Sequence, residues 1–397
     1  MTRGPRILPA ALAAVLALAT AAAAEEDKKD PAVGRAAAAK WIDVLKREPG
    51  RRVQAAAELG RIGPPAGAAI EALVAVLGDR DDDVRGNAVW ALGEIAGLRY
   101  EPVVVPFKPE YIAKHYPPTE DRKANSEPLV KLALPALQRA LADKSDDVRV
   151  NAAYALGCME ELAKDAAPLL SRVLLKDEDR RVRANAAWAL TKVPGTAKAV
   201  MPALKEAAAS KDEFIRHTAC HAIGWYGADG ASALPVILKA MDAEPGGRMS
   251  RKMNYLGVIG NMEQAAASAV PRVAPLLDSK DWGEVASAAW CLGKIRTGVL
   301  PSVPRLTELL GSDDGYVRWN VAWALGRLGP DAKSAAAELR RVSEEDPEAR
   351  VRANALQALS IISGVAVPTG TNAEEPTGSG AGGSIIVSSG DTIQVVK

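Results

Sequence analysis

The sequence predicts an all-α protein, a right-handed solenoid of about eight helical hairpins followed by a terminal capping helix. The main signal is one stretch, VRANAAWAL at 182–190, which returns in related form at 84–93, 148–157, 317–326 and 351–356. Apolar residues within a copy are three or four positions apart, as in Val84, Ala88, Ala91 and Ile95, which indicates one face of a helix. A single hairpin cannot bury such a face, so the units are expected to stack.

A small residue closes each copy and defines the period. These closing residues are Gly60, Gly93, Gly157, Thr191, Gly224, Gly257, Gly293, Gly326 and Ser360. They follow one another at intervals of 33 to 36 residues, except for one interval of 64. A second apolar segment, usually with a proline, comes after each copy, and an Asp-rich turn leads to the next one. Each period therefore predicts two helices, and the long interval predicts one period plus an insertion.

The repeated units resemble HEAT repeats, of the short bacterial type that is also seen in phycobilin lyases. The resemblance extends over about residues 40–363, nearly the whole chain beyond its first residues. It implies an α-solenoid in which each unit contacts its neighbours. It implies little about function, because the motif residues build the scaffold.

Composition excludes several classes of function. Hydrophobic residues make up 48% of the 397 but aromatic residues only 4%, so alanine must fill much of the core. The formal net charge of +1 gives no electrostatic case for nucleic acid or for an anionic membrane. Cys158, Cys220 and Cys291 fall in first helices of different units, too far apart for disulfides, and are interpreted as small buried residues.

Residues 1–24 have the features of a secretory signal peptide. Arg3 and Arg6 precede an apolar run from Ile7, and three alanines stand before Glu25. The alternative is an uncleaved membrane anchor, for which the run is short and weakly apolar. Cleavage would leave 48 basic against 49 acidic residues. We therefore expect an exported protein, periplasmic or extracellular, without membrane insertion after cleavage.

The remaining boundaries follow from breaks in the repeat. Residues 25–35 are expected to be a flexible lead-in, 36–363 the solenoid, and 364–397 a disordered Gly/Ser-rich tail with two β-prone segments near its end. The insertion covers 98–128 and is rich in proline and aromatic residues. Its candidate contact residues are Tyr100, Phe107, Tyr111, His115 and Tyr116. Two interpretations stay open, a binding loop and a structural flap over neighbouring helices.

Charged and polar residues recur at the start of the first helices. An arginine follows the valine in most copies, although the copies near 249–256 and 284–285 lack it, and an aspartate stands just ahead, as in Asp179 and Arg183. We expect the aspartates to cap helices, the arginines to pair with the turn of a neighbouring unit, and Asn87, Asn151 and their equivalents to bond neighbouring turns. This is scaffold chemistry.

One helix position carries large rings. They are Trp90, Tyr154, Trp188, Trp290 and Trp323. Rings at helical spacing are expected to fill gaps between alanine-rich units, and the sharper alternative is a stripe that stacks on a carbohydrate or peptide.

The second helices carry a basic row. Its members are Arg139, Arg172, Lys239, Arg272 and Arg305. Because second helices usually line the concave side of HEAT-like stacks, this row is a candidate surface for an acidic partner, although Glu206 and Glu308 interrupt it.

His217 and His221 are weak candidates for a metal site. They are four residues apart and share a helix face, but a transition metal usually takes three or four protein ligands, and no third ligand is visible in the sequence. Phosphate-loop, nucleophile-elbow and zinc-protease motifs are absent. The di-iron hydroxylases with HEAT-like folds need several His-Glu pairs, which this chain lacks.

The function expected from the sequence is protein binding by a non-catalytic scaffold or adaptor, through an extended concave surface. No cofactor is expected, a protein partner is, and the chain is expected to be a monomer. The alternative is a HEAT-like enzyme or cofactor carrier, lyase-like or a metal-dependent oxidoreductase, that uses the insertion with His217 and His221.

Overall fold

The computed structural model describes residues 31–96, 120–193, 195–244, 251–364, 376, 385–386 and 394–395. The chain divides into two compact units, one made of 1–100 with 115–163 and the other of 101–114 with 164–397. Both units are built from helical hairpins, so the predicted all-α solenoid is confirmed.

Unit 1 consists of short helices joined by tight turns. Its helices are α2 (Pro31–Arg47), α3 (Arg52–Ile62), α4 (Ile70–Ala75), α5 (Asp82–Ala96), α7 (Glu120–Pro128), α8 (Leu134–Ala140) and α9 (Asp146–Cys158). The helices with the Val-Arg motif pack side by side, α3 on α5 and α5 on α9.

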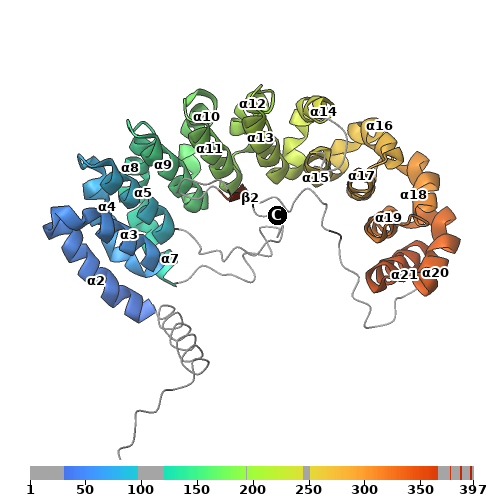
Figure 1. The fold of residues 1–397 in the computed structure, drawn as a ribbon, viewed down its shortest axis with the longest axis horizontal. Coiled ribbons are helices and arrows are strands. Elements are labelled where there is room, and N and C mark those ends of the chain that lie inside the picture. Colours follow the sequence, from blue (N-terminus) through green and yellow to red (C-terminus); the bar gives the residue numbers. More distant parts are fainter. Residues whose placement is uncertain are drawn as a thin grey trace, which may run out of the picture. The chain divides into compact units, whose positions relative to one another are not determined.

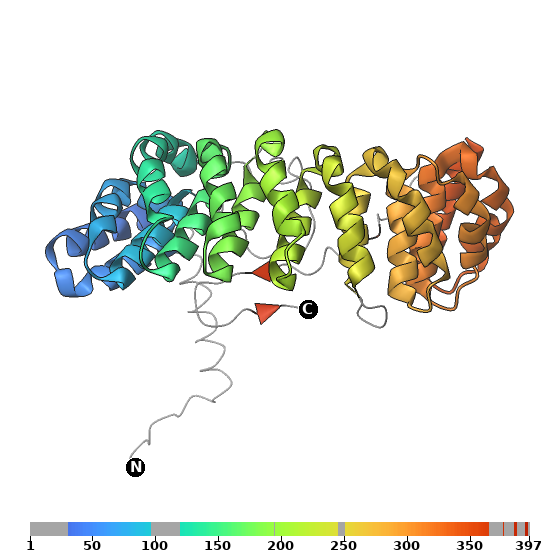
Figure 2. The ribbon, with the colours of Figure 1, turned by 90° about the horizontal axis from the view of Figure 1, so that it is seen from above.

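Unit 2 arranges its helices in two rows (Figure 1). The inner row holds the motif helices α11 (Arg180–Lys192), α13 (Glu213–Trp225), α15 (Lys252–Asn261), α17 (Trp282–Ile295), α19 (Gly315–Leu328) and α21 (Ala349–Ser363). The outer row holds α10 (Ala167–Lys176), α12 (Ala197–Ala208), α14 (Leu234–Ala243), α16 (Val270–Val273), α18 (Val303–Leu309) and α20 (Ala336–Glu345). Figure 2 shows the hairpins of this unit side by side. Strands β1 (Ile385–Ile386) and β2 (Gln394–Val395) pair antiparallel within the two predicted β-prone segments.

The expectation that second helices line the concave side is wrong for unit 2, where they form the outer row (Figure 1). The reason is the size of the residues between helices. A Cβ added to Gly293 would lie 2.8 Å from the Cα of Ala324, and one added to Gly326 would lie 3.0 Å from the Cα of Ala358. Motif helices that meet through glycine and alanine approach closely, whereas the outer helices meet through larger side chains, so the row curves toward the motif helices.

Large rings fill gaps between neighbouring motif helices, as predicted, and the structure shows that these gaps lie over the closing glycines. A Cβ at Gly60 would overlap the ring of Trp90, and one at Gly293 would lie 2.9 Å from the ring of Trp323. Trp290 and Trp323 stack with ring centroids 6.3 Å apart, and both are buried. These two rings therefore belong to the packing between neighbouring motif helices.

The register predicted for α15 is wrong by three residues. A Cβ at Gly260 would overlap the ring of Trp290, whereas a Cβ at Gly257 would meet nothing within 4 Å. The residue three positions after Gly260, Glu263, has a φ of 51°, and the equivalent Gly227 after Gly224 has a φ of 53°. Gly260 is therefore the closing residue of this unit, and the irregular interval lies before α15 and not after it.

Three predicted boundaries also need correction. Helix α2 begins at Pro31, inside the expected lead-in, and α7 occupies 120–128, inside the expected insertion. Asn125 anchors α7 by donating a hydrogen bond to the Pro64 carbonyl over 2.9 Å. In the tail, Pro376 is buried and β1 pairs with β2, so these described residues are not part of a featureless segment. Residues 1–30 lie outside the described part of the chain.

The cysteines lie in α9, α13 and α17, three different motif helices, as predicted. All three are free thiols, and Cys220 and Cys291 are buried. Burial raises the pKa of the Cys220 thiol to about 12, so it is protonated at neutral pH.

Candidate functional site

An arginine near the start of most motif helices contacts two turns, although α15 and α17 lack it. Arg52 of α3 donates its Nε to the Leu45 carbonyl. In α5, α11, α13 and α19 the arginine Nη1 donates to a carbonyl six residues earlier, as Arg318 does to Ser312 over 2.8 Å. The guanidinium of these arginines also reaches an acid in the turn before the next motif helix. These pairs, here called joints, are Arg52–Asp79 (2.7 Å), Arg85–Asp143 (2.8 Å), Arg183–Asp212 (3.2 Å), Arg216–Glu244 (3.5 Å) and Arg318–Asp346 (2.7 Å). The predicted pairing with a neighbouring turn is confirmed, and so is capping by Asp179, Asp212 and Asp314.

The asparagines mostly behave differently from the prediction. Asn151 does donate to the Gly86 carbonyl of the neighbouring motif helix, over 3.0 Å. Asn87, Asn185 and Asn320 instead donate to carbonyls four residues earlier in their own helices. An asparagine amide can reach the carbonyl four residues earlier in its own helix, so this hydrogen bond forms instead of one to a neighbouring turn.

The predicted basic row lies on the outer side. Arg172, Lys239 and Arg272 are exposed on outer helices of unit 2, and Arg139 is exposed on α8 of unit 1. Arg272 pairs with Asp242, and Arg305 pairs with Asp278 at 2.8 Å and with Glu308 at 2.9 Å. Two of the five charges are therefore neutralised, and the row does not face the inside of unit 2.

The insertion residues Tyr100, Phe107, Tyr111, His115 and Tyr116 lie outside the described residues. The two interpretations of the insertion, binding loop and flap, stay predictions.

The inner row of unit 2 presents an aromatic and basic cluster on α11 and α13. Lys192 Nζ lies 4.9 Å from the ring centroid of Trp225 and 5.7 Å from that of Trp188. His221 meets Trp225 edge to face, with ring centroids 6.3 Å apart. Trp225 is 41% exposed, which is unusual for so large an apolar side chain. This cluster, defined as Trp188, Lys192, His221 and Trp225, lies at the position that Trp290 and Lys294 occupy in α17.

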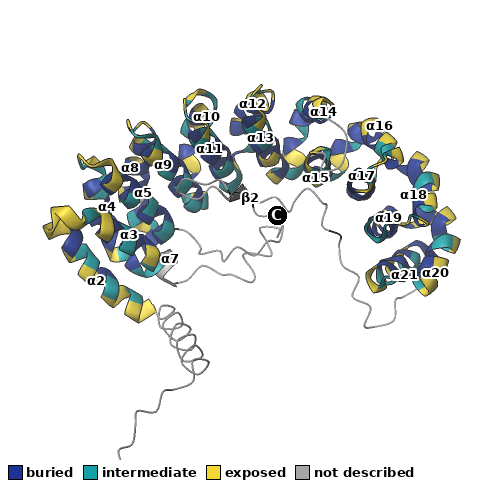
Figure 3. Ribbon diagram, in the orientation of Figure 1, coloured by how far each residue is buried: buried dark blue, intermediate teal, exposed yellow. Residues whose placement is uncertain are grey.

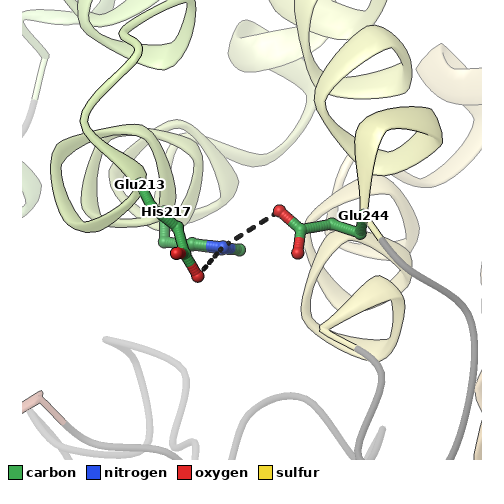
Figure 4. A group of neighbouring side chains, drawn as sticks. All are labelled: Glu213, His217 and Glu244. Carbon is green, nitrogen blue, oxygen red and sulfur yellow. Dashed lines mark ion pairs between the residues drawn. The ribbon is translucent and has the colours of Figure 1, made fainter.

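The structure separates the two predicted metal candidates. His221 belongs to the cluster on α11 and α13, whereas His217 faces Glu213, one turn earlier in α13, and Glu244, which follows α14 (Figure 4). His217 Nε2 lies 3.2 Å from a Glu244 carboxylate oxygen and 3.9 Å from one of Glu213. The three possible ligand atoms lie within 4.8 Å of one another.

Two arginines and a tyrosine surround this group of three side chains. Arg216 lies 3.5 Å from Glu244, Arg251 pairs with Glu213, and the Tyr255 hydroxyl donates to Glu244 over 3.3 Å. Burial lowers the pKa of His217 below its ordinary value of 6.5, and the Glu244 carboxylate opposes this effect. The imidazole is therefore neutral near pH 7 and has a lone pair to offer.

Charge balance decides how well a metal fits here. Two carboxylates and a neutral imidazole form a plausible ligand set for a divalent transition metal. Arg216 and Arg251 already neutralise the two carboxylates, so an ion must displace Arg251, whose side chain is half exposed. The sequence carries a signal for Glu213, which precedes His217 by four residues in the same helix, but none for Glu244, which is 27 residues away and is brought to His217 by the hairpin.

Among the described helices, none is both long and apolar enough to cross a membrane. A shallow groove of about 490 Å³ lies on the outer side, between α12 and the turn before α14. It is lined by Lys198, Lys205 and Asp229 among others. Because these side chains carry both signs of charge, they indicate no particular class of ligand.

Comparisons with known proteins agree with this architecture. The family model for HEAT repeats matches residues 38–107, 130–191, 173–253 and 276–360. An engineered protein of known structure is similar over 83% of this chain and 89% of its own, at 20% identity and a TM-score of 0.54. Importin beta is similar over 85% of this chain at 15% identity and a TM-score of 0.55, and the match spans 46% of its length.

These likenesses concern the fold alone, since their identities are low. The CpcE–CpcF complex of the phycocyanin lyase from Nostoc sp. PCC7120 covers 59% of this chain and 96% of its own at 20% identity, but its TM-score of 0.38 supports no argument. Among curated proteins, none matches this chain.

Proposed function

Because the chain belongs to the HEAT-repeat family, we propose that it is an exported, non-catalytic scaffold that binds another protein along the inner row of unit 2. The observation that carries this proposal is the cluster of Trp188, Lys192, His221 and Trp225. Interface hot spots are enriched in tryptophan and in cations that stack on rings, at positions where a partner can exclude water. Within this cluster, Trp225 is the exposed ring that a partner can cover.

The inner row suits a protein better than a small molecule. Its side chains project from successive helices, and adjacent helices are about 10 Å apart. A partner segment can therefore contact several helices at once, with small contributions from each. The chemistry of the cluster favours a partner with aromatic or acidic side chains.

Photo-crosslinking in the producing cell tests whether the partner protein contacts the inner or the outer row of helices of unit 2. A photoreactive phenylalanine at Asn261, exposed at the end of α15, should give adducts with one defined protein. The photoreactive phenylalanine placed at Lys239, which is exposed on α14 of the outer row, is the matched control and should give no adduct. Trp225→Ala should weaken the Asn261 adduct about tenfold or more, because a hot-spot tryptophan contributes about 2 kcal/mol or more. Equal adducts from both rows would reject the inner-row assignment.

Export is a separate part of the proposal and rests on the sequence of residues 1–24. The expected mature N-terminus is Glu25, which N-terminal sequencing of the protein purified from its natural source determines. Replacing Arg3 and Arg6 by glutamate should retain the protein in the cytoplasm, because the charged start of a signal peptide is required for targeting. A mature chain that keeps Met1 would contradict cleavage.

The insertion is proposed as a second contact region. Its deletion should be limited to 98–119, because α7 begins at Glu120 and Asn125 bonds Pro64. We expect unchanged helicity and a weaker crosslink from Asn261. A crosslink of unchanged strength would favour the structural flap.

A second candidate function, a metal-dependent enzyme or carrier, is favoured by one observation, the grouping of Glu213, His217 and Glu244. The test is metal content of the purified protein by mass spectrometry, together with a visible spectrum. A stoichiometric metal that is lost in His217→Ala but kept in His221→Ala would support this function. A metal-free protein after incubation with Zn²⁺ would reject it.

A further inference from the structure

One residue of α17 departs from the burial of the rest of the helix. Every residue from Gly283 to Ile295 is buried, and Figure 3 draws this helix mostly in the colour of buried residues. Trp282, the first residue of α17, is instead 50% exposed, more than any other large apolar side chain in the described part of the chain. A tryptophan with so much apolar surface in water is a candidate contact for another molecule.

The other hairpins show that packing does not require this ring. Trp282 lies eleven residues before the closing Gly293, and the charged residues at the same position elsewhere are Asp82, Asp146, Arg180 and Glu213. Tyr316 and Trp319 of α19 have no aromatic equivalents in α5, α9 and α11 either. The residues there are Asp83, Asp147 and Arg181 for the first and Gly86, Val150 and Ala184 for the second. Since these hairpins stack without rings at the three positions, the scaffold does not need them in α17 and α19.

The three rings form a continuous row across the first turns of α17 and α19. Trp282 meets Tyr316 edge to face, with ring centroids 5.9 Å apart and ring planes at 83°. Tyr316 meets Trp319 at 5.7 Å, and the Arg350 guanidinium of α21 lies 5.1 Å from the Trp319 ring. Trp319 is buried and Arg350 pairs with Glu348, so this end of the row is closed. The exposed Trp282 and the half-buried Tyr316 form an accessible corner, here called the notch.

The turns beside the notch are acidic. Asp281, Asp313 and Asp314 stand directly before α17 and α19, whereas Lys280 is the one base in these two turns, 279–281 and 312–314. Asp281 and Asp314 cap their helices with a single carboxylate oxygen, Oδ1, which accepts from two backbone amides in each case. Each of these two carboxylates keeps a second oxygen for another donor, and Asp313 is exposed. Three aspartates against one lysine favour a positively charged ligand.

The angle and spacing of the two rings select among possible ligands. A sugar stacks on a flat platform of ring faces, whereas the nearly perpendicular rings of Trp282 and Tyr316 form a corner. A chain in the polyproline II conformation rises about 3.1 Å per residue, so prolines two residues apart are separated by about 6 Å. This separation matches the 5.9 Å between the ring centroids. Aromatic surfaces of this kind bind proline-rich segments, and adjacent acids add a preference for arginine or lysine in the segment.

We propose that the notch of Trp282 and Tyr316 docks an extended, basic, proline-containing segment of a partner protein. A proline packs into the corner between the two rings, and a basic side chain of the segment reaches the carboxylate of Asp313. This surface is separate from the cluster on α11 and α13, so it adds a second docking region of different chemistry to the proposed scaffold.

Fluorescence anisotropy of a labelled peptide of four Arg-Pro-Pro triplets, titrated with the full chain at low ionic strength, tests the proposal. Trp282→Ala should weaken binding about tenfold or more, because an exposed ring at the centre of a contact is a hot spot. Trp282→Phe should keep most of the affinity, since a ring remains. Asp313→Asn should weaken binding about two- to threefold. The matched control Glu178→Gln removes an exposed acid from the same turn position before α11 and should change nothing.

Two further measurements separate this site from its alternatives. A peptide of four Glu-Pro-Pro triplets should not bind, and Trp225→Ala should leave binding of the basic peptide unchanged, because that ring belongs to the cluster on α11 and α13. Absence of saturable binding, equal binding of the acidic peptide, or unchanged affinity in Trp282→Ala would each overturn the proposal. Binding of cellohexaose that is lost in Trp282→Ala, without binding of the peptide, would overturn it in favour of a carbohydrate site.

Discussion

The joint between α19 and α21 and the joint between α13 and α15 occupy equivalent places in unit 2, yet they hold charge differently. Arg318 clamps Asp346 with two nitrogens, at 2.7 and 3.1 Å, and both side chains are at least 90% buried. Arg216 reaches Glu244 with one nitrogen at 3.5 Å, and Glu244 also faces His217 and Tyr255. The first joint is a closed ion pair, and the second is a looser group of several residues.

The difference follows from side-chain size. Glutamate replaces aspartate at the second joint, which moves the carboxylate one methylene further from the turn. Tyr255 stands where α21 has Ala355, and its buried side chain donates a hydrogen bond to the same carboxylate. Three polar groups then share one carboxylate. A buried ion pair with two aligned hydrogen bonds is rigid, whereas a carboxylate shared by three partners can exchange one partner for another. We therefore expect α13 and α15 to separate more easily than α19 and α21.

The largest effect should come from breaking the closed joint. Arg318→Ala leaves Asp346 buried without its partner and should lower the free energy of unfolding by about 3 to 5 kcal/mol. Urea denaturation of the full chain measures this loss. Arg341→Ala, which removes an exposed arginine paired with Glu338 three residues away, is the matched control and should cost about 1 kcal/mol or less. Similar losses for the two variants would contradict the assigned importance of burial.

The next effect concerns the register of α15. Gly260→Ala should destabilise the protein by about 1 to 3 kcal/mol, because the new methyl group would overlap the Trp290 ring. Gly257→Ala should stabilise it by about 0.5 to 1 kcal/mol, because space is open there and alanine favours a helix. Thermal unfolding followed by circular dichroism compares the two. The opposite order would restore the register expected from the sequence.

Breaking the looser joint should cost less than breaking the closed one. Arg216→Ala removes one of several partners of Glu244 and should lower stability by about 1 to 2 kcal/mol, since the Tyr255 hydroxyl still bonds the carboxylate. The same urea titration as for Arg318→Ala gives the comparison. A loss as large as that of Arg318→Ala would show that the two joints are equally closed.

The smallest effect is a dependence on pH at the looser joint. The pKa of His217 is lowered in the folded protein, so the unfolded chain binds a proton first as pH falls through about 6.5. Stability should therefore decline below pH 6.5, with a slope of at most about 1.4 kcal/mol per pH unit from this residue. His217→Gln should flatten that part of the profile, and His221→Gln should flatten it as well, because burial also lowers the pKa of that imidazole. An unchanged slope in His217→Gln would contradict the assignment.

The closed joint should respond only in stronger acid. Burial raises the pKa of Asp346, but the hydrogen bonds from Arg318 and from the Glu348 amide outweigh burial and hold it below its ordinary value of 3.8. The contribution of Asp346 to the free energy of unfolding is therefore complete above about pH 4 and is lost below it. When the stability of the full chain is measured against pH, the loss from His217 should therefore appear first as pH falls, and the loss from Asp346 should follow in stronger acid.

The sequence by itself determined the hairpin repeat, the arginine pairs between neighbouring turns, the capping aspartates and the rings that fill gaps between units. All of these depend on spacing within a period of about 33 residues, which is directly readable. Residue size could also have shown the direction of curvature, because Gly293 and Ala324 meet in one row while leucines and prolines occupy the other. Second helices usually line the concave side of HEAT-like stacks, and in unit 2 the basic row lies on the opposite side from this family expectation (Figure 1).

Only the tertiary structure decided which residues meet across a hairpin. Glu244 joins His217 because α14 returns the chain to α13, and the register of α15 was ambiguous while Gly257 and Gly260 both fitted the pattern. The burial of α17, α19 and Pro376 was equally invisible in the sequence. A periodic pattern specifies which face of a helix is apolar, but it does not specify what covers that face, since that depends on contacts between residues far apart in the chain.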